Sequence, residues 1–281
     1  MILFQNSYLS EEMIMSTYVM ADIHGCYDEF QQMLDKINFN PEVDELIIAG
    51  DIVDRGPQSY EMLEYARSEP KGVKFIKGNH DVDFARYCSK IFNCAYSVNA
   101  TIQSMDVWGS GVRDHYGTVE RLVNQHKLNA ADFQIWNRMF SRMPYYLERV
   151  IGNGRYINKY IIVHGGFISP EDYTTFTGER PFDYLAEDIE DFYVWAREEG
   201  VKYGGKPNAT VIFGHTPTIF EEEMFYNKGK VCTLYNERNC RFINIDCGLV
   251  YGKNYPDDEE GRNGNLACIR LEDEEVFYLY E

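Results

Sequence analysis

The sequence lacks any uninterrupted apolar run that approaches the length of a membrane span. A transmembrane helix needs about 20 consecutive apolar residues, and polar or charged residues interrupt every hydrophobic stretch of this chain. Residues 1–15 are apolar only at the start, carry no basic cluster and continue into the acidic pair Glu11 and Glu12. We therefore expect no membrane partner and no signal peptide, and we expect residues 1–15 to form a loose extension.

Basic residues are scarce. The chain has 27 Lys and Arg against 45 Asp and Glu, which gives a net charge of -18. Such a surface repels nucleic-acid backbones, so we expect no nucleic-acid partner. Part of the acidity is concentrated in residues 221–223, 257–260 and 272–275, which we interpret as solvated loops.

Paired cysteine motifs are also missing. The seven cysteines are odd in number and form no C-x-x-C pair. A chain of 281 residues with 44% hydrophobic residues can fill its own core without disulfides. We expect a cytoplasmic protein, one domain over residues 16–281, and no obligate protein partner.

Five short motifs combine Asp, His or Asn with glycine. Four of them directly follow an apolar, β-favouring run, so their polar side chains are expected where strands end. The motifs are Asp22-Ile23-His24-Gly25, Gly50-Asp51-Ile52-Val53-Asp54-Arg55-Gly56, Gly78-Asn79-His80-Asp81, His164-Gly165-Gly166 and Gly214-His215-Thr216.

The rest of the pattern predicts an α/β fold. Strands at 17–20, 45–49 and 73–77 alternate with helices around 30–37 and 58–67. Residues 82–143 look helical and contain no metal-ligand types in this spacing, so we expect a helical insertion there. Further strands are expected at 145–148, 156–163, 211–213, 241–245, 266–271 and 276–280.

The polar residues of the motifs are those that two divalent metal ions would need. Carboxylate oxygens and imidazole nitrogens bind such ions, and a carboxylate can bridge two of them. We expect Asp51 to be the bridge because its strand is expected to be central. The predicted metal ligands are Asp22, His24, Asp51, Asn79, His164 and His215, and a set without thiolates favours Mn²⁺, with iron, zinc or nickel as alternatives.

Four further residues suit phosphate chemistry. His80 follows the candidate ligand Asn79 and can protonate a leaving oxygen as a general acid, with Asp54 fixing its tautomer. The guanidinium groups of Arg55 and Arg197 can grip phosphate oxygens. For Arg197 a surface ion pair is the alternative interpretation.

Taken together, the motifs resemble those of the calcineurin-like metallophosphoesterases, and in particular the small bacterial and phage branch of the Ser/Thr phosphoprotein phosphatases. The resemblance implies a β-sandwich flanked by helices, in four layers, and a hydroxide activated by two metals. It also implies roles for the motif residues: Asp22, His24 and Asp51 bind one metal, Asp51, Asn79, His164 and His215 bind the other, His80 and Asp54 form the acid pair, and Arg55 and Arg197 clamp phosphate.

Three functions compete. The first is a phosphoprotein phosphatase that also accepts small phosphoesters. The second is a symmetrical diadenosine tetraphosphate hydrolase: Asp81 and the motif around Asp22 resemble those enzymes, which typically have Ala in place of Asp54 and Ala in place of Gly165. The third is a non-catalytic binding module, which is disfavoured because no named position is lost. The intact pair of Asp54 and His80 favours a monoester substrate, because an alkoxide gains more from a general acid than an anhydride leaving group does.

Overall fold

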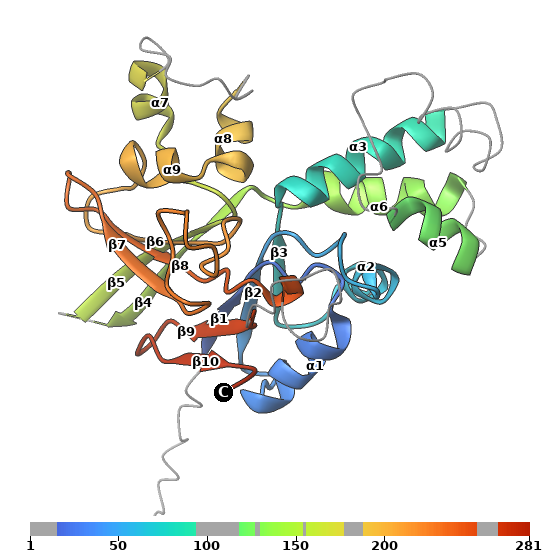
Figure 1. The fold of residues 1–281 in the computed structure, drawn as a ribbon, viewed down its shortest axis with the longest axis horizontal. Helices are drawn as coiled ribbons and strands as arrows, with labels where there is room; N and C mark the ends of the chain where they lie inside the picture. The colour runs from blue at the N-terminus through green and yellow to red at the C-terminus, as the bar shows by residue number, and fades with distance from the viewer. Residues whose placement is uncertain (1–15, 94–117, 127–129, 154–155, 177–187, 252–263) are drawn as a thin grey trace, which may run out of the picture.

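Two five-stranded sheets form the centre of the molecule in this computed structural model (Figure 1). The structure describes residues 16–93, 118–126, 130–153, 156–176, 188–251 and 264–281. The expected N-terminal extension and the middle of the expected insertion lie outside these residues. In the first sheet the strand order is β10-β9-β1-β2-β3, and in the second it is β4-β5-β6-β8-β7.

The first sheet contains the early strands of the chain. Its parallel strands are β1 (Thr17–Met20), β2 (Glu45–Ala49) and β3 (Val73–Ile76). The antiparallel strands β9 (Ala267–Arg270) and β10 (Val276–Tyr278) extend it beyond β1. The helices α1 (Tyr27–Lys36) and α2 (Ser59–Arg67) connect the parallel strands, as the sequence predicts.

The second sheet is also mixed. Here β5 (Tyr156–Val163), β6 (Thr210–Phe213) and β8 (Arg241–Asn244) run parallel, and β4 (Tyr146–Asn153) and β7 (Cys232–Tyr235) flank them antiparallel. The sequence analysis misses β7. Its residues alternate between partial burial and exposure at the sheet edge, so it has no continuous apolar run.

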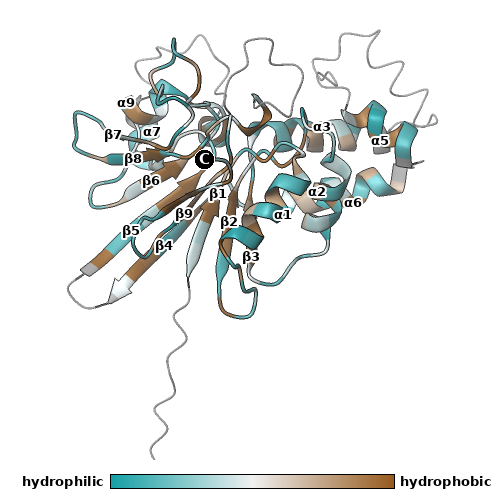
Figure 2. Ribbon diagram, turned by 60° about the horizontal axis from the view of Figure 1, so that its bottom comes forward, coloured by the Kyte–Doolittle hydropathy of each residue, from teal (hydrophilic) through white to brown (hydrophobic). Residues whose placement is uncertain are grey.

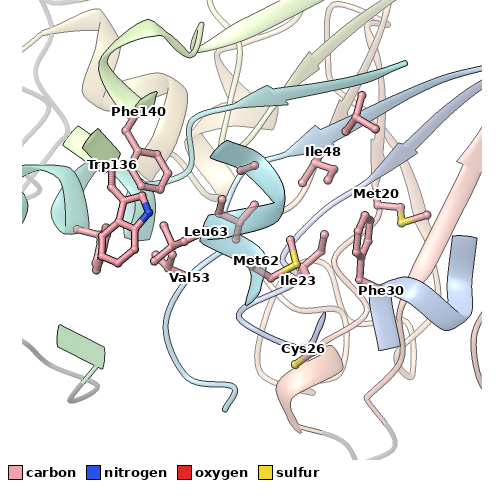
Figure 3. Close-up of a cluster of buried hydrophobic side chains, with 14 of the residues drawn as sticks. Met20, Ile23, Cys26, Phe30, Ile48, Val53, Met62, Leu63, Trp136 and Phe140 are labelled. Carbon is pink, nitrogen blue, oxygen red and sulfur yellow. The ribbon is translucent and has the colours of Figure 1, made fainter. Parts of the chain in front are cut away.

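Three apolar layers hold these elements together. Side chains of β1 and β2 pack alternately to the two faces of their sheet, because successive residues of a strand point to opposite sides. Tyr18 and Met20 contact the layer beneath α1 and α2, whereas Val19 faces the second sheet. Figure 3 shows part of the first layer, with Met20 near Phe30 and with Met62 beside Leu63 and Ile23.

The far face of the second sheet is covered by short helices. α8 (Ile189–Trp195) and α9 (Glu198–Lys202) supply Tyr193 and Val201 to a layer with Val163 and Phe213. A third helix, α7 (Pro170–Phe176), lies near them (Figure 1). The order helix, sheet, sheet, helix confirms the predicted four-layer sandwich.

The helical region predicted for 82–143 begins earlier than expected. α3 (Asn79–Asn93) starts inside the third motif, because the Gly78 carbonyl accepts a hydrogen bond from Val82 N at 3.0 Å. His80 therefore lies in the first turn of this helix. α5 (Thr118–His126) and α6 (Ala130–Arg142) group with α3 at one side of the sheets (Figure 1), and Phe84 packs on Trp136 and Phe140.

In the described helices, hydrophilic and hydrophobic residues alternate along the ribbon, whereas the strands themselves contain hydrophobic stretches (Figure 2). Among the described residues, no helix is both long and apolar enough to cross a membrane. Within the same part of the chain, the six cysteines present are free thiols.

Candidate metal centre

The predicted ligands come together at one edge of the two sheets. Asp22, Asp51 and Asn79 follow β1, β2 and β3, while His164 and His215 follow β5 and β6. Because these strands are parallel within each sheet, their carboxyl ends meet on the same side. All five side chains are buried, with at most 8% of each residue exposed.

Asp51 lies at the centre of the cluster. One of its carboxylate oxygens, Oδ2, is 3.3 Å from His164 Nε2 and 3.5 Å from His24 Nε2. The other oxygen, Oδ1, accepts a hydrogen bond from the backbone N–H of His80 at 3.0 Å. This central position fits the predicted bridging carboxylate.

Asp22 and His215 meet from opposite sheets. The backbone N–H of His215 donates to both carboxylate oxygens of Asp22, at 3.2 and 3.0 Å. The approach requires glycine at position 214, since a Cβ there would lie 2.0 Å from Asp22 Oδ2. Gly78 is required for the same reason, because its Cβ would lie 2.1 Å from Asp51 Oδ1.

Two histidines are fixed with Nε2 toward the cluster. His24 Nδ1 donates to the Val53 carbonyl and His164 Nδ1 donates to the Ala49 carbonyl, both at 2.9 Å. Such a bond to the backbone sets the tautomer and leaves Nε2 for a metal ion. At 2.9 Å from His164 Nε2 lies Asn79 Oδ1, another candidate ligand atom.

Burial and charge set the protonation of the cluster. Burial lowers the pKa of His24 and of His215, which favours the neutral imidazole that metal binding needs. For His164, burial acts in the same direction, but the carboxylates of Asp51 and Asp22 outweigh it and raise the pKa to about 10. The same two carboxylates would attract a divalent cation to this position.

The residues fit a pair of metal ions. Among the described residues, His24, Asp51 and His80 form one group of potential ligands and Asp51, His164 and His215 form another. The ligand atoms within each group lie within 4.8 Å of one another, and Asp51 belongs to both. Within the described part of the chain, His215 Nε2 is buried without a hydrogen-bond partner, which is costly unless it binds an ion.

One feature of this grouping differs from the prediction. The first group contains His80, whereas the sequence analysis assigns Asp22 as the ligand beside His24. Asp22 Oδ1 is 4.0 Å from His24 Nε2, so it also borders the group.

The backbone of the site is strained. Asp22, His24, Asp51, Asp54, Arg55 and His215 all have positive φ, between 48° and 72°. Non-glycine residues in this region cost of order 1–3 kcal/mol each and cluster at functional sites. The surrounding sheets therefore hold these residues in a geometry that the local chain does not favour.

His80 forms hydrogen bonds with both Asp54 and Arg55. Its Nδ1 donates to Asp54 Oδ2 at 2.7 Å, and Arg55 Nη2 donates to its Nε2 at 3.2 Å. Arg55 Nη1 also donates to Tyr251 Oη at 2.9 Å. The predicted contact between Asp54 and His80 is thus formed. Arg55 donates its hydrogen bond to Nε2, the nitrogen that would carry the proton if His80 acts as a general acid.

Arg197 reaches the site from the connection between α8 and α9. Its Nη1 donates to Thr216 Oγ1 at 3.2 Å, and Thr216 follows His215 directly. Within the described part of the chain, the Arg197 side chain forms no ion pair, which was the alternative interpretation. All ten predicted site residues therefore surround one centre.

The sequence analysis assigns no role in the site to three further residues. Asp81 and Asp246 are at most 3% exposed, and the partly buried Tyr251 contacts Arg55. Burial raises the pKa of Asp246 to about 6. The pKa of Asp22 is also raised, mainly by burial and next by the negative charge of Asp246. A signal was present in the sequence, since Asp246 follows the strand β8 just as Asp51 follows β2.

Comparison with known proteins identifies the class. A model of the calcineurin-like phosphoesterase family matches residues 15–246, so the chain belongs to this family. The structure of a Ser/Thr phosphatase from Saccharomyces cerevisiae, similar to human PP5, aligns with a TM-score of 0.54 at 14% identity. That alignment covers 94% of this chain and 78% of the yeast protein, and at this identity it supports the shared fold.

Among curated relatives, the matches are local. A symmetrical bis(5'-nucleosyl)-tetraphosphatase of Erwinia tasmaniensis is 52% identical over 68 residues, which is 24% of this chain and 25% of that protein. A protein of the same name from Buchnera aphidicola subsp. Baizongia pistaciae is 39% identical over 95 residues, 33% of this chain and 34% of that protein. The chain thus matches between a quarter and a third of the length of these two relatives.

Proposed function

We propose that this chain hydrolyses phosphate esters or anhydrides with two divalent metal ions. The observation that carries the proposal is the Asp51 carboxylate, shared by two groups of buried potential ligands. Asp22, His24 and Asp51 would hold one ion, and Asp51, Asn79, His164 and His215 the other. When bound, the ions would supply charge stabilisation and an acidified water, and Mn²⁺ is the first ion to test.

The remaining residues act on the substrate. Arg55 and Arg197 approach the centre from different elements and would bind phosphate oxygens with charge-assisted hydrogen bonds. Binding of a phosphate would draw Arg55 away from His80 Nε2, so that this nitrogen could take up a proton and then donate it to the leaving oxygen. Asp54 keeps the imidazole oriented and stabilises its protonated form.

The first candidate substrate is a dinucleoside polyphosphate. The relatives with local identities of 52% and 39% both carry the name of a symmetrical tetraphosphatase. Symmetrical hydrolysis of diadenosine tetraphosphate would use one water and release two molecules of ADP. The anionic polyphosphate would meet the two arginines, despite the acidic charge of the whole chain.

The second candidate is a phosphomonoester, including phosphoserine or phosphothreonine in proteins. The observation that favours it is the 2.7 Å contact between Asp54 and His80, which orients a general acid. An alkoxide of high pKa needs this proton more than an ADP leaving group does.

We also propose a reducing, cytoplasmic location, supported by the free thiols of the described residues.

A substrate panel tests these proposals. With Mn²⁺ present, kcat/KM is compared for diadenosine tetraphosphate, a phosphothreonine peptide and para-nitrophenyl phosphate. The first candidate requires diadenosine tetraphosphate to be the best substrate with ADP as the product, and a higher value for the peptide would replace it with the second. If none of the three is hydrolysed, the hydrolytic function itself is wrong.

A further inference from the structure

Trp195 exposes a large aromatic ring beside the metal centre. It is the last residue of α8 and is 43% exposed, although Phe192, Tyr193 and Val194 before it are buried. Its ring centroid lies 6.0 Å from that of His215, with the two planes at 90°. An isolated exposed aromatic is ordinary on a protein surface, but this one touches a candidate metal ligand.

The backbone around Trp195 is firmly held. The Tyr193 carbonyl accepts a hydrogen bond from Gly165 N at 2.7 Å, which ties α8 to the loop that follows His164. A Cβ on Gly165 would lie 3.0 Å from the Ala196 carbonyl oxygen, so the loop packs directly on the end of the helix. The position of the indole is therefore coupled to the position of the centre.

The residues next to Trp195 are suited to phosphate. Arg197 lies two positions further along the chain and donates to Thr216, the neighbour of His215. A phosphate gripped by Arg197 would thus lie near His215, with the indole alongside. The substrate group that is attached to this phosphate on the side of Trp195 would contact the flat, apolar and partly exposed indole ring.

We propose that Trp195 is a stacking platform for the base of a nucleotide whose phosphate is bound at the Asp51 centre. This rests on the proposed function, because it requires a phosphate at that centre. Stacking of a base on an aromatic side chain contributes about 1–3 kcal/mol, equivalent to a change in affinity of about 5- to 150-fold. Trp195 then selects nucleotides over phosphate compounds that carry no flat ring.

Two inhibitors that differ only in the base test the platform. AMP and ribose 5-phosphate offer the same phosphate and sugar, and only AMP has a ring to stack. We expect AMP to compete with para-nitrophenyl phosphate at least 5-fold better than ribose 5-phosphate does in the wild-type enzyme. Trp195→Ala should abolish this ratio, and Trp195→Phe, which keeps a flat ring, should retain most of it.

Fluorescence gives a readout that does not depend on turnover. Among the described residues, Trp136 is buried at 2% exposure and Trp195 is the exposed tryptophan. Stacking of AMP should quench the fluorescence of the wild type, and this quenching should be lost in Trp195→Phe. Tyr235→Ala is the matched control, because Tyr235 is 60% exposed and pairs with Arg241, at the end of β8 away from the centre.

The outcomes separate the platform from the proposed function. Equal inhibition of the wild type by AMP and ribose 5-phosphate, or equal weakening of both by Trp195→Ala, would overturn the platform while leaving hydrolysis intact. Absence of any hydrolysis by the metal-loaded wild type would overturn the proposed function instead. In that case quenching by AMP that requires Trp195 would still support the platform.

Discussion

The carboxylate of Asp81 accepts a hydrogen bond from the backbone N–H of Asp51 at 2.8 Å. The same oxygen accepts from Gly78 N at 2.9 Å, and the other oxygen accepts from Ile52 N at 3.0 Å. One fully buried side chain therefore joins the loop of the second motif to the loop of the third. Asp51 and Asn79 thereby keep a fixed separation, although they are 28 positions apart in the chain.

Replacing Asp81 by Asn should loosen this connection. An amide has one acceptor oxygen, so its NH₂ group would face a backbone N–H that is left without a partner, which costs about 1–3 kcal/mol. We expect Asp81→Asn to lower the free energy of unfolding by that amount and to reduce Mn²⁺ content. Urea denaturation and metal analysis measure the two effects, and unchanged values for both would contradict the positioning role. Asp83→Asn, on the same helix and more exposed, is the control.

Metal dependence should follow the position of Asp51. Treatment with a chelator is expected to abolish hydrolysis of para-nitrophenyl phosphate, and Mn²⁺ is expected to restore it. Asp51→Asn weakens both ligand groups, whereas His24→Ala removes a member of one group only. We therefore expect Asp51→Asn to lower kcat and bound Mn²⁺ more than His24→Ala does. Similar, mild losses in the two variants would argue against a shared carboxylate.

The clamp residues should act on phosphate binding. Arg55 and Arg197 each offer charge-assisted hydrogen bonds worth several kcal/mol in a desolvated site. We expect Arg55→Ala and Arg197→Ala to lower kcat/KM by at least about tenfold for every phosphate substrate. Metal content should stay at the wild-type level, since neither residue is a proposed ligand. Wild-type kinetics in Arg197→Ala would remove that residue from the clamp.

Much of this architecture can be read from the sequence. The strands β1, β2, β5 and β6 end in apolar runs, and each is closely followed by a motif that combines Asp or His with glycine. The local sequence pattern is enough to find these strands and the ligands after them. Residues that bind a common ion must follow the carboxyl ends of parallel strands, because only there do they meet at one edge of the sheet. The sequence analysis also expects Asp54 to orient the ring of His80, as the family resemblance implies, and the structure places the two side chains in contact.

Other features depend on contacts between distant segments. The hydrogen bond from Arg55 to His80 Nε2 and the bonds of Asp81 to two loops exist only after the sheets assemble. The edge strand β7 has no apolar run from which it could be predicted. The exposure of Trp195 depends on how the end of α8 packs against the loop that contains Gly165. Sequence pattern alone carries no information about such pairings across the fold.

An ion pair between the sheets makes stability depend on pH. Arg241 of β8 donates to both oxygens of Glu274, at 2.5 and 2.7 Å, and Tyr160 of β5 donates to Glu274 Oε1 at 3.0 Å. The bonds from Arg241 lower the pKa of Glu274 despite its partial burial. Its stabilising contribution is therefore present above the unfolded pKa of about 4.3 and disappears as the pH falls through the lower folded value.

Replacing Glu274 by Gln should reveal this contribution. At pH 7 we expect the free energy of unfolding to fall by about 1 kcal/mol, because the pair is only partly buried. The difference from the wild type should shrink as the pH is lowered below about 4. Urea denaturation at pH 7 and at acidic pH measures it, with Glu222→Gln as the exposed control. A difference that is independent of pH would show that the charge of Glu274 is not its source.

The pKa of the leaving group tests the role of His80. If His80 protonates the departing oxygen, His80→Asn should lower kcat about 10²- to 10⁴-fold on a phosphothreonine peptide. The loss should be much smaller on para-nitrophenyl phosphate, whose phenolate leaves without a proton. Asp54→Asn should show the same pattern more weakly, because the imidazole stays in place while its orienting anion is lost.

Metal content distinguishes an acid from a ligand at this position. His80 Nε2 lies 4.0 Å from Asp51 Oδ2, and His80 belongs to one of the two potential ligand groups. If His80 is the acid, His80→Asn should bind as much Mn²⁺ as the wild type and lose activity according to the leaving group. Equal losses on both substrates together with lost metal would make His80 a ligand, and the Arg55 contact would then reflect packing around the ion.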